Sequence, residues 1–230
     1  MAEIRDIEVV VFDILGTLVD EPGGRRAAIR EAIPGADDAA VGELLGLWDR
    51  HLDGEQRRIA QGDRPYADSE ALDAEAAQRI AAQAGLTDPA AIARLATAGQ
   101  RLPAWEDSAA GLESLARDLP VLGLSNASRT ALLRLNAHAG LRWHQAVSAE
   151  AVRAYKPAPE VYRLAVDIAA CPPERMLMVA AHAWDLRAAQ AAGMRTAYVH
   201  RPVGDPPTPA DTFDGRFGGL HDLAAQVKSW

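Results

Sequence analysis

Polar residues follow short apolar runs of this sequence, where buried strands are expected to end. Asp13 follows one such run, the pair Ser125-Asn126 follows a second and Asp185 a third, while Lys156 precedes a helical stretch. A carboxylate beside an ammonium group can act as a nucleophile, because the cation keeps the carboxylate ionised. We expect these groups to converge on one crevice.

Each of these residues also has a plain structural interpretation. An aspartate at a strand end is often a helix cap or turn residue, and Ser125-Asn126 could simply open a helix. Most lysines are solvated, so Lys156 could lie on the surface. Chance explains one polar group at the end of an apolar run better than it explains four, so we favour a shared site.

The apolar runs themselves predict a parallel sheet. They are rich in β-branched residues and do not alternate with polar ones, which is typical of strands covered on both faces. The predicted strands span residues 7–12, 120–124, 175–180 and 195–199, with a weaker one at 145–147. Helical patterns separate them at 108–118, 128–139, 159–169 and 184–192. Such alternation predicts right-handed crossovers, with ligands bound beyond the carboxyl ends of the strands.

The stretch from Pro22 to Ala98 has no strand-like run, and apolar residues such as Leu44, Trp48 and Leu52 recur there at helical spacing. We therefore predict an α/β fold with a Rossmann-like parallel sheet core and an inserted all-helical cap. The core takes residues 1–20 and 99–230, and the cap takes 21–98 after the first strand. Residues 201–219 are rich in Pro, Gly and Asp and are predicted to be mostly loop.

Composition excludes several functional classes. The 230 residues include 24 Lys and Arg against 32 Asp and Glu, a net charge of −8, which disfavours nucleic acid and anionic membranes as partners. No apolar run approaches the roughly 20 residues that span a bilayer. The charged N-terminus does not look like an export signal, and a single cysteine cannot form an internal disulfide. We expect a cytoplasmic globular protein.

The polar groups and their flanking residues together resemble the haloacid dehalogenase superfamily. Four motifs occur in the superfamily's order: Phe12-Asp13-Ile14-Leu15-Gly16-Thr17-Leu18, Leu124-Ser125-Asn126, Tyr155-Lys156-Pro157 and Val179-Ala180-Ala181-His182-Ala183-Trp184-Asp185. The Ala183-Trp184-Asp185 core is similar to that of the type II 2-haloacid dehalogenases, and so is segment 101–107.

Leu15 indicates which chemistry this resemblance implies. Superfamily phosphatases carry a second aspartate two residues after the nucleophile, as a general acid and as part of a Mg²⁺ site. Here that residue is Leu15, which cannot transfer a proton. A departing halide is a weak base and needs no proton donor. The resemblance therefore implies hydrolysis of a carbon–halogen bond, without a metal or other cofactor.

The resemblance also implies roles for the motif residues. Asp13 would attack C2 of a small 2-haloacid to give an ester, and water would then attack the Asp13 carbonyl carbon. Lys156 would keep Asp13 ionised, Thr17 would hydrogen-bond it, and Asp185 would orient either Lys156 or the hydrolytic water.

Further residues are candidates for binding the substrate. Ser125, Asn126 and the backbone at Leu15 could hold the substrate carboxylate and stabilise the ester oxyanion. Trp184 could form a wall of the pocket and exclude bulk water. An ordinary core tryptophan is an equally open interpretation of that residue.

Two positions depart from the dehalogenase pattern. Members of this branch bind the halide with an arginine in a Leu-Trp-Arg segment of the cap, whereas this chain has Leu47-Trp48-Asp49. Trp48 and Arg50 remain candidates for substrate binding, although Arg50 is turned by about 100° around the helix. His182 replaces the usual asparagine. It could donate a hydrogen bond to the substrate, with a charge that depends on pH near neutrality, or it could be a packed histidine.

Two other functions stay open at this point. A Mg²⁺-dependent small-molecule phosphatase with an unusual first motif would place its metal between Asp13 and Asp185. A catalytically silent ligand-binding member of the superfamily would keep the fold alone. The resemblance also allows a homodimer through the cap helices.

Overall fold

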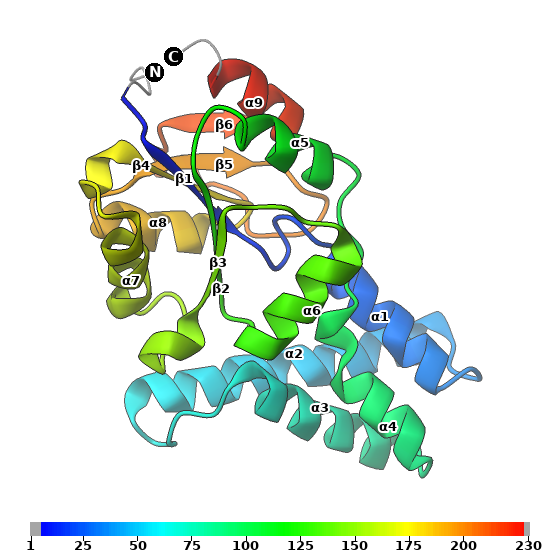
Figure 1. The fold of residues 1–230 in the computed structure, drawn as a ribbon. Helices are drawn as coiled ribbons and strands as arrows, with labels where there is room; N and C mark the ends of the chain where they lie inside the picture. Colours follow the sequence, from blue (N-terminus) through cyan, green and yellow to red (C-terminus); the bar gives the residue numbers. More distant parts are fainter. Residues whose placement is uncertain (1–5, 228–230) are drawn as a thin grey trace.

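A computed structural model describes residues 6–227 and shows a six-stranded sheet with helices on both faces and four further helices beyond one end (Figure 1). The predicted core range also includes residues 1–5 and 228–230, which lie outside the described residues. The prediction that the charged N-terminus is not an export signal also falls partly on residues 1–5. Among the described residues, no helix is long and apolar enough to cross a membrane.

The sheet is parallel, with the strand order β3-β2-β1-β4-β5-β6. The strands are β1 (Val9–Asp13), β2 (Val121–Ser125), β3 (Gln145–Ser148), β4 (Met176–Ala180), β5 (Arg195–Val199) and β6 (Gly215–Phe217). From β1 the chain continues to β2 on one side and later to β4 on the other, so the strand order reverses at β1. A reversal of this kind leaves a crevice beyond the carboxyl ends of the strands, where Asp13 lies.

Five core helices cover the two faces of the sheet. They are α5 (Ser108–Leu115), α6 (Arg129–Ala139), α7 (Pro159–Ala169), α8 (Ala183–Ala191) and α9 (Leu220–Val227), and short 3₁₀ turns occur at Ala98–Gln100, Ala149–Val152 and Pro173–Arg175. Helices α5, α6 and α9 pack on one face, and α7 and α8 pack on the other. The central strands β1, β2 and β4 are therefore buried along their whole lengths, which explains their unbroken apolar sequences.

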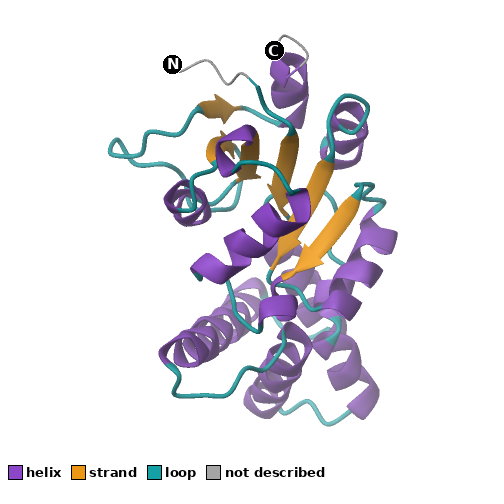
Figure 2. Ribbon diagram, turned by 60° about the vertical axis from the view of Figure 1, so that its left-hand side comes forward, coloured by secondary structure: helices purple, strands orange, loops and turns teal. Residues whose placement is uncertain are grey.

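Four helices form the cap: α1 (Glu21–Ala32), α2 (Asp38–Gln61), α3 (Ser69–Ala84) and α4 (Pro89–Ala96). Each begins after an aspartate whose side chain accepts a hydrogen bond from a backbone N–H in the first turn: Asp20, Asp37, Asp68 and Asp88. The cap has its own apolar core, which includes Trp48 and Leu72. Figure 2 shows the arrowheads of the central strands directed toward these helices.

The chain enters and leaves the cap at adjacent points. Val19 and Ala104 form an isolated antiparallel bridge between the two crossing segments. On either side of it, the Asp20 N–H donates to the Pro103 carbonyl at 2.8 Å, and the Trp105 N–H donates to the Leu18 carbonyl at 3.1 Å. These bonds hold the two crossings together at the base of the cap.

The structure confirms the predicted fold class, an α/β parallel sheet with an inserted helical cap. The domain boundaries at residues 20/21 and 98/99 stay predictions. Residues 201–219 are mostly loop, as predicted, but the short strand β6 lies among them and was not predicted. This strand has three residues and pairs with β5 at the edge of the sheet, so it lacks the long apolar run that identifies a central strand.

Gly111 marks a close contact in the core that can be tested. A Cβ atom at this position would lie 2.4 Å from Cβ of Leu220, so α5 and α9 would have to move apart. We expect Gly111→Ala to lower the free energy of unfolding by about 1–3 kcal/mol. Gly54→Ala is the matched control in α2, where nothing lies within 4 Å of the new methyl group.

The control should raise stability by about 0.5–1 kcal/mol, because alanine favours a helix over glycine. Urea unfolding of both variants provides the measurement. Equal stabilities for the two variants would contradict the close contact between α5 and α9.

Candidate active site

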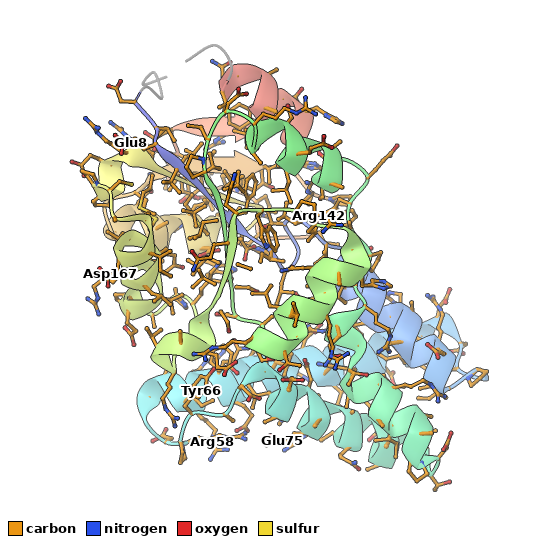
Figure 3. The ribbon with its side chains drawn as sticks, viewed as in Figure 1. Glu8, Arg58, Tyr66, Glu75, Arg142 and Asp167 are labelled. Carbon is orange, nitrogen blue, oxygen red and sulfur yellow. The ribbon has the colours of Figure 1, made fainter. Side chains whose placement is uncertain are left out.

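A cavity of about 530 Å³ lies between the carboxyl edge of the sheet and the cap. Asp13, Lys156 and His182 line it from the core, and Arg25 and Asp49 line it from cap helices. Most charged side chains lie elsewhere. Figure 3 places Glu8, Arg58 and Asp167 at the outside of the molecule, where they are exposed. Charged side chains that line a cavity are therefore an exception among the charged residues of this molecule.

Asp13 is held by three side chains. Its Oδ1 accepts a hydrogen bond from Lys156 Nζ at 3.0 Å. Its Oδ2 accepts from Thr17 Oγ1 at 2.6 Å and lies 3.1 Å from His182 Nδ1. Burial would raise the pKa of Asp13, but Lys156, His182 and Thr17 outweigh that effect and hold the pKa well below its usual range. Asp13 is therefore an ionised carboxylate inside the protein.

Lys156 bridges Asp13 to a second buried carboxylate. Its Nζ also donates to Asp185 Oδ2 at 2.8 Å, and the Tyr162 hydroxyl donates to Asp185 Oδ1. Burial opposes the charge of Lys156, but Asp13 and Asp185 raise the pKa of the ammonium group. Asn126 Oδ1 accepts from the Lys156 backbone N–H at 2.8 Å, which ties the lysine segment to the end of β2.

The turn after β1 brings Thr17 and His182 to the nucleophile. Thr17 Oγ1 donates to Asp13 and accepts from the Ala181 N–H at 2.9 Å, so it links the ends of β1 and β4. Gly16 has φ +79°, and a Cβ there would lie 2.6 Å from Cε1 of His182. A glycine is therefore required both by the backbone conformation and by the imidazole packed against it.

Most of the predicted core residues meet at this place. Asp13, Leu15, Asn126, Lys156, His182 and Trp184 line the cavity. The Trp184 ring lies 5.7 Å from the His182 ring, between centroids. Thr17 and Asp185 lie directly behind the cavity lining and contact Asp13 and Lys156, respectively.

Ser125 does not line the cavity in the way that we expected. Its side chain is fully buried, and its Oγ accepts a hydrogen bond from the Ala127 N–H at 3.1 Å. This is the turn interaction that a serine at a strand end can provide. The geometry therefore supports a structural role for Ser125, whereas Asn126 faces the cavity.

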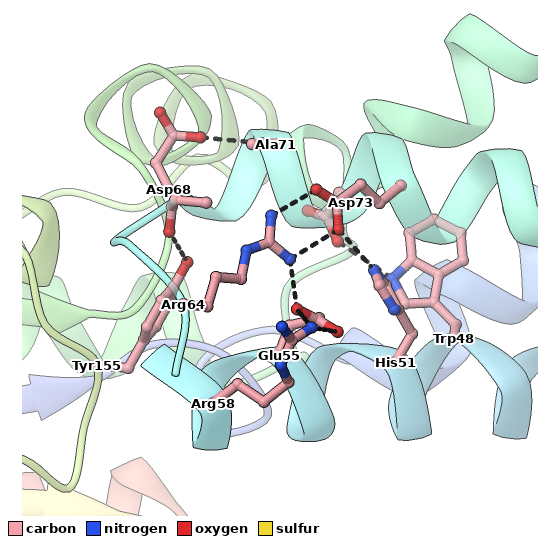
Figure 4. Close-up of polar contacts among 11 residues, drawn as sticks. Trp48, His51, Glu55, Arg58, Arg64, Asp68, Ala71, Asp73 and Tyr155 are labelled. Atoms are coloured by element: carbon pink, nitrogen blue, oxygen red, sulfur yellow. Dashed lines mark hydrogen bonds and ion pairs between the residues drawn. The ribbon is translucent and has the colours of Figure 1, made fainter. Parts of the chain in front are cut away.

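Trp48 and Arg50, the two predicted substrate-binding residues of α2, do not line the cavity. Trp48 is fully buried in the core of the cap, and its Nε1 donates to Asp73 Oδ1 at 3.1 Å, as Figure 4 shows. Arg50 is exposed and does not line the cavity. Successive residues of a helix are turned by about 100°, so Asp49 faces the cavity while its two neighbours face elsewhere.

Arg25 is a cavity residue that sequence reasoning missed. Its guanidinium contacts Glu21 Oε1 at 2.7 Å and Asp49 Oδ1 at 3.1 Å, and it lies 5.6 Å from the centroid of the Trp48 ring. Burial opposes its charge, but Glu21, Asp73 and Asp49 raise the pKa of Arg25. The spacing of Glu21 and Arg25 by four residues indicates a helical ion pair, but it does not show which face of α1 meets the cavity.

Tyr162 is the second residue that was missed. It lies in the first turn of α7, six residues after Lys156, and is fully buried. Burial and the charge of Asp185 raise the pKa of its hydroxyl, which therefore stays protonated and donates to that carboxylate. In the sequence, Tyr162 stands out only as an aromatic residue three positions after Pro159, where α7 begins. An aromatic residue at such a position is also typical of ordinary core packing.

A polar network holds the cap helices behind the cavity (Figure 4). Arg64 contacts Glu55 of α2 and Glu75 of α3, both at 2.5 Å, and His51 Nε2 lies 3.1 Å from the same Glu75. Tyr155 donates from its hydroxyl to the Ala67 carbonyl at 2.8 Å and so connects the cap to the segment that carries Lys156. The network fixes α2 relative to α3.

Comparison with known proteins agrees with the motif arrangement. The chain matches the haloacid dehalogenase-like hydrolase family over residues 7–193. It is 31% identical over 202 residues to an (S)-2-haloacid dehalogenase of Pseudomonas putida, which covers 86% of this chain and 88% of the relative.

Solved structures agree as well. One L-2-haloacid dehalogenase superposes with a TM-score of 0.88 at 29% identity, over 97% of this chain and 100% of that one. Another, from Xanthobacter autotrophicus, contains covalently bound chloropropionic acid and gives a TM-score of 0.83 at 27% identity, over 96% and 98% of the two chains. The chain therefore belongs to the haloacid dehalogenase-like hydrolase family, within its L-2-haloacid dehalogenase group.

Proposed function

We propose that this protein is a hydrolase of the carbon–halogen bond of small 2-haloacids, giving a 2-hydroxy acid and a halide. The observation that carries the proposal is the buried, ionised Asp13, which faces a cavity and is paired with Lys156. The named dehalogenase relatives support this chemistry, and their stereochemical names favour the (S)-enantiomer as substrate.

In the first half of the reaction, Asp13 attacks C2 of the substrate and the halide leaves with the bonding electrons. The product is an ester between Asp13 and the substrate. Lys156 holds the carboxylate ionised and oriented for this attack. Leu15 offers no proton to the leaving group, and a halide needs none.

In the second half, water attacks the carbonyl carbon of the Asp13 ester and releases the hydroxy acid. Asp185 is fully buried and does not line the cavity, and its two oxygens are bonded to Lys156 and Tyr162. This geometry favours the first of its two predicted roles, which is to orient Lys156. Asp185 thus gives Lys156 a second hydrogen-bond partner besides Asp13.

The substrate carboxylate and the halide are anions, and the cavity must offer donors to both. Asn126 and Leu15 line the cavity from the core, where the Asn126 amide and the Leu15 backbone N–H can serve as donors. On the cap side, Arg25 supplies a cation, and its contacts with Glu21 and Asp49 use two of its five N–H donors. We assign to Arg25 the anion-binding role that Arg50 was expected to provide. A cytoplasmic location and a homodimer through the cap stay predictions.

The first test measures halide release from chloroacetate, fluoroacetate and both enantiomers of 2-chloropropionate, with EDTA present throughout. We expect release from at least one haloacid, with the (S)-enantiomer preferred. A phosphatase would instead turn over p-nitrophenyl phosphate and lose that activity in EDTA. A silent binding protein would show thermal stabilisation by a haloacid without turnover.

Asp13→Asn tests the nucleophile itself. We expect halide release to fall by roughly a thousandfold or more, because an amide is a poor nucleophile, while the thermal melt stays cooperative. Turnover of the wild-type enzyme in ¹⁸O-labelled water should place label in the peptide that contains Asp13. Turnover without such label would show that water attacks the substrate directly and would overturn the ester mechanism.

Arg25→Met and Arg50→Met form a matched pair for the anion-binding role. Loss of a charge-assisted hydrogen bond typically weakens binding by roughly tenfold to a hundredfold, so we expect kcat/KM of Arg25→Met to fall by that factor. Arg50 is exposed outside the cavity, and its variant should match the wild-type enzyme. Equal losses in both variants would point to a general effect of cap charge instead.

A further inference from the structure

The two oxygens of Asp13 have different hydrogen-bond partners. Oδ2 meets both Thr17 Oγ1, at 2.6 Å, and His182 Nδ1, at 3.1 Å. Oδ1 meets Lys156 Nζ at 3.0 Å. A carboxylate oxygen has two lone pairs, so both pairs of Oδ2 are engaged, while one pair of Oδ1 is left for attack on a substrate. The geometry thus makes Oδ1 the nucleophilic atom.

This assignment decides the position of the charge in the second half-reaction. After Oδ1 has attacked, it is the bridging oxygen of the ester, and Oδ2 is the carbonyl oxygen. When water adds to Cγ, negative charge develops on Oδ2. The two donors that already contact Oδ2 are then placed where an oxyanion forms.

We propose that His182 is a catalytic residue of ester hydrolysis, which with Thr17 forms an oxyanion hole for Oδ2 of Asp13. The inference rests on the proposed dehalogenase function and deepens it. Asp13 is ionised and can only accept hydrogen bonds, so His182 donates through a protonated Nδ1. An imidazolium donor stabilises the oxyanion more strongly than a neutral donor does.

The hydrolytic step balances with water as the co-reactant. The water oxygen bonds to Cγ, and the electron pair of the Cγ=Oδ2 bond moves onto Oδ2. The pair then returns as the bond between Cγ and the bridging oxygen breaks. One proton of the water passes to the departing hydroxy oxygen, and the other is lost to solvent as Asp13 becomes a carboxylate again. His182 keeps its proton throughout the step.

The surroundings of His182 favour the protonated ring. Burial opposes the charge, but the hydrogen bond and charge of Asp13, with Asp185 and Glu21 at longer range, raise the pKa of the imidazole above its usual value. Five charged groups surround the ring: Asp13 of β1, Glu21 of α1, Asp185 of α8, Lys156 before α7 and Asp205 in the loop after β5.

Packing keeps the ring in this orientation. Gly16 lies against one side of it, since a Cβ there would be 3.0 Å from His182 Nε2, and Trp184 lies on another. The side chain is 19% exposed, which leaves it in reach of water from the cavity. A donor that is fixed before the reaction needs no reorganisation when the charge develops.

The proposal predicts different effects on the two half-reactions. A donor on Oδ2 withdraws charge from the attacking carboxylate but stabilises the oxyanion. Removing it should therefore leave ester formation as fast as before, or faster, and should slow ester hydrolysis. A residue that only supports the fold would slow both steps together.

Three variants separate the donor from its charge. Asparagine offers an amide N–H near the position of Nδ1, so His182→Asn keeps a neutral donor. His182→Gln moves the donor away, and His182→Leu removes it. His138→Asn changes an exposed histidine of α6 and is the control, which should match the wild-type enzyme.

Single-turnover experiments with an (S)-2-haloacid measure the two steps separately, with halide release for ester formation and hydroxy-acid release for hydrolysis. We expect His182→Leu to hydrolyse the ester roughly a hundredfold to a thousandfold more slowly, as for loss of other oxyanion donors, with halide release preserved. The ester should accumulate and be visible by intact-protein mass spectrometry. His182→Gln should behave similarly, and His182→Asn should lose about tenfold or less.

The pH profile identifies the charge. As pH rises through the pKa of His182, the imidazolium is lost, so the hydrolysis rate of the wild-type enzyme should fall relative to that of His182→Asn. A relative rise would indicate a general base and would overturn the proposal, as would unchanged hydrolysis in His182→Leu. If the wild-type enzyme released no halide from any haloacid, the dehalogenase function itself would fail, a result distinct from these.

Discussion

The site depends on one buried ammonium group placed between two carboxylates. Lys156 Nζ lies 3.0 Å from Asp13 and 2.8 Å from Asp185 in a fully buried position. Removing one partner from a buried ion pair leaves an uncompensated charge, which is strongly destabilising. The hydroxyl of Tyr162 completes the arrangement by holding Asp185 from α7. Strand β1, the segment before α7, α7 itself and α8 must therefore all be in place before Asp13 can function.

The cap side of the cavity has charged residues of its own, with one cation among several acids. Arg25 is the cap cation, and acids surround it, among them Asp49 and Asp73. Burial raises the pKa of Asp49 and raises that of Asp73 to about 6, so these carboxyls take up a proton more readily than exposed aspartates do. The field at the substrate therefore depends on how fully each acid of the wall is ionised.

The sequence was most informative where one physical signal dominated. Both covered faces of the sheet require unbroken apolar strands, so the central strands and the polar residues that end them could be located. Arg25 and Arg50 could not be distinguished, because their exposure depends on the rotation of α1 and α2 against the core. Ser125 was equally ambiguous, since a serine at a strand end suits a turn as well as a ligand. Strand β6 was missed because three residues at a sheet edge carry no pattern.

The paired crossings at the base of the cap have a consequence for how such a protein can diversify. Entry and exit are joined by the bridge between Val19 and Ala104, so the distance that the cap must span is the same whatever is built between them. A change of length inside the cap therefore leaves the place where it joins the core unchanged, provided that the contact between Tyr155 and Ala67 is kept. Asp13 and the cap wall of its cavity are thus encoded in separate stretches of the chain, whereas the core wall, with Leu15 and Asn126, shares its stretches with the chemical step.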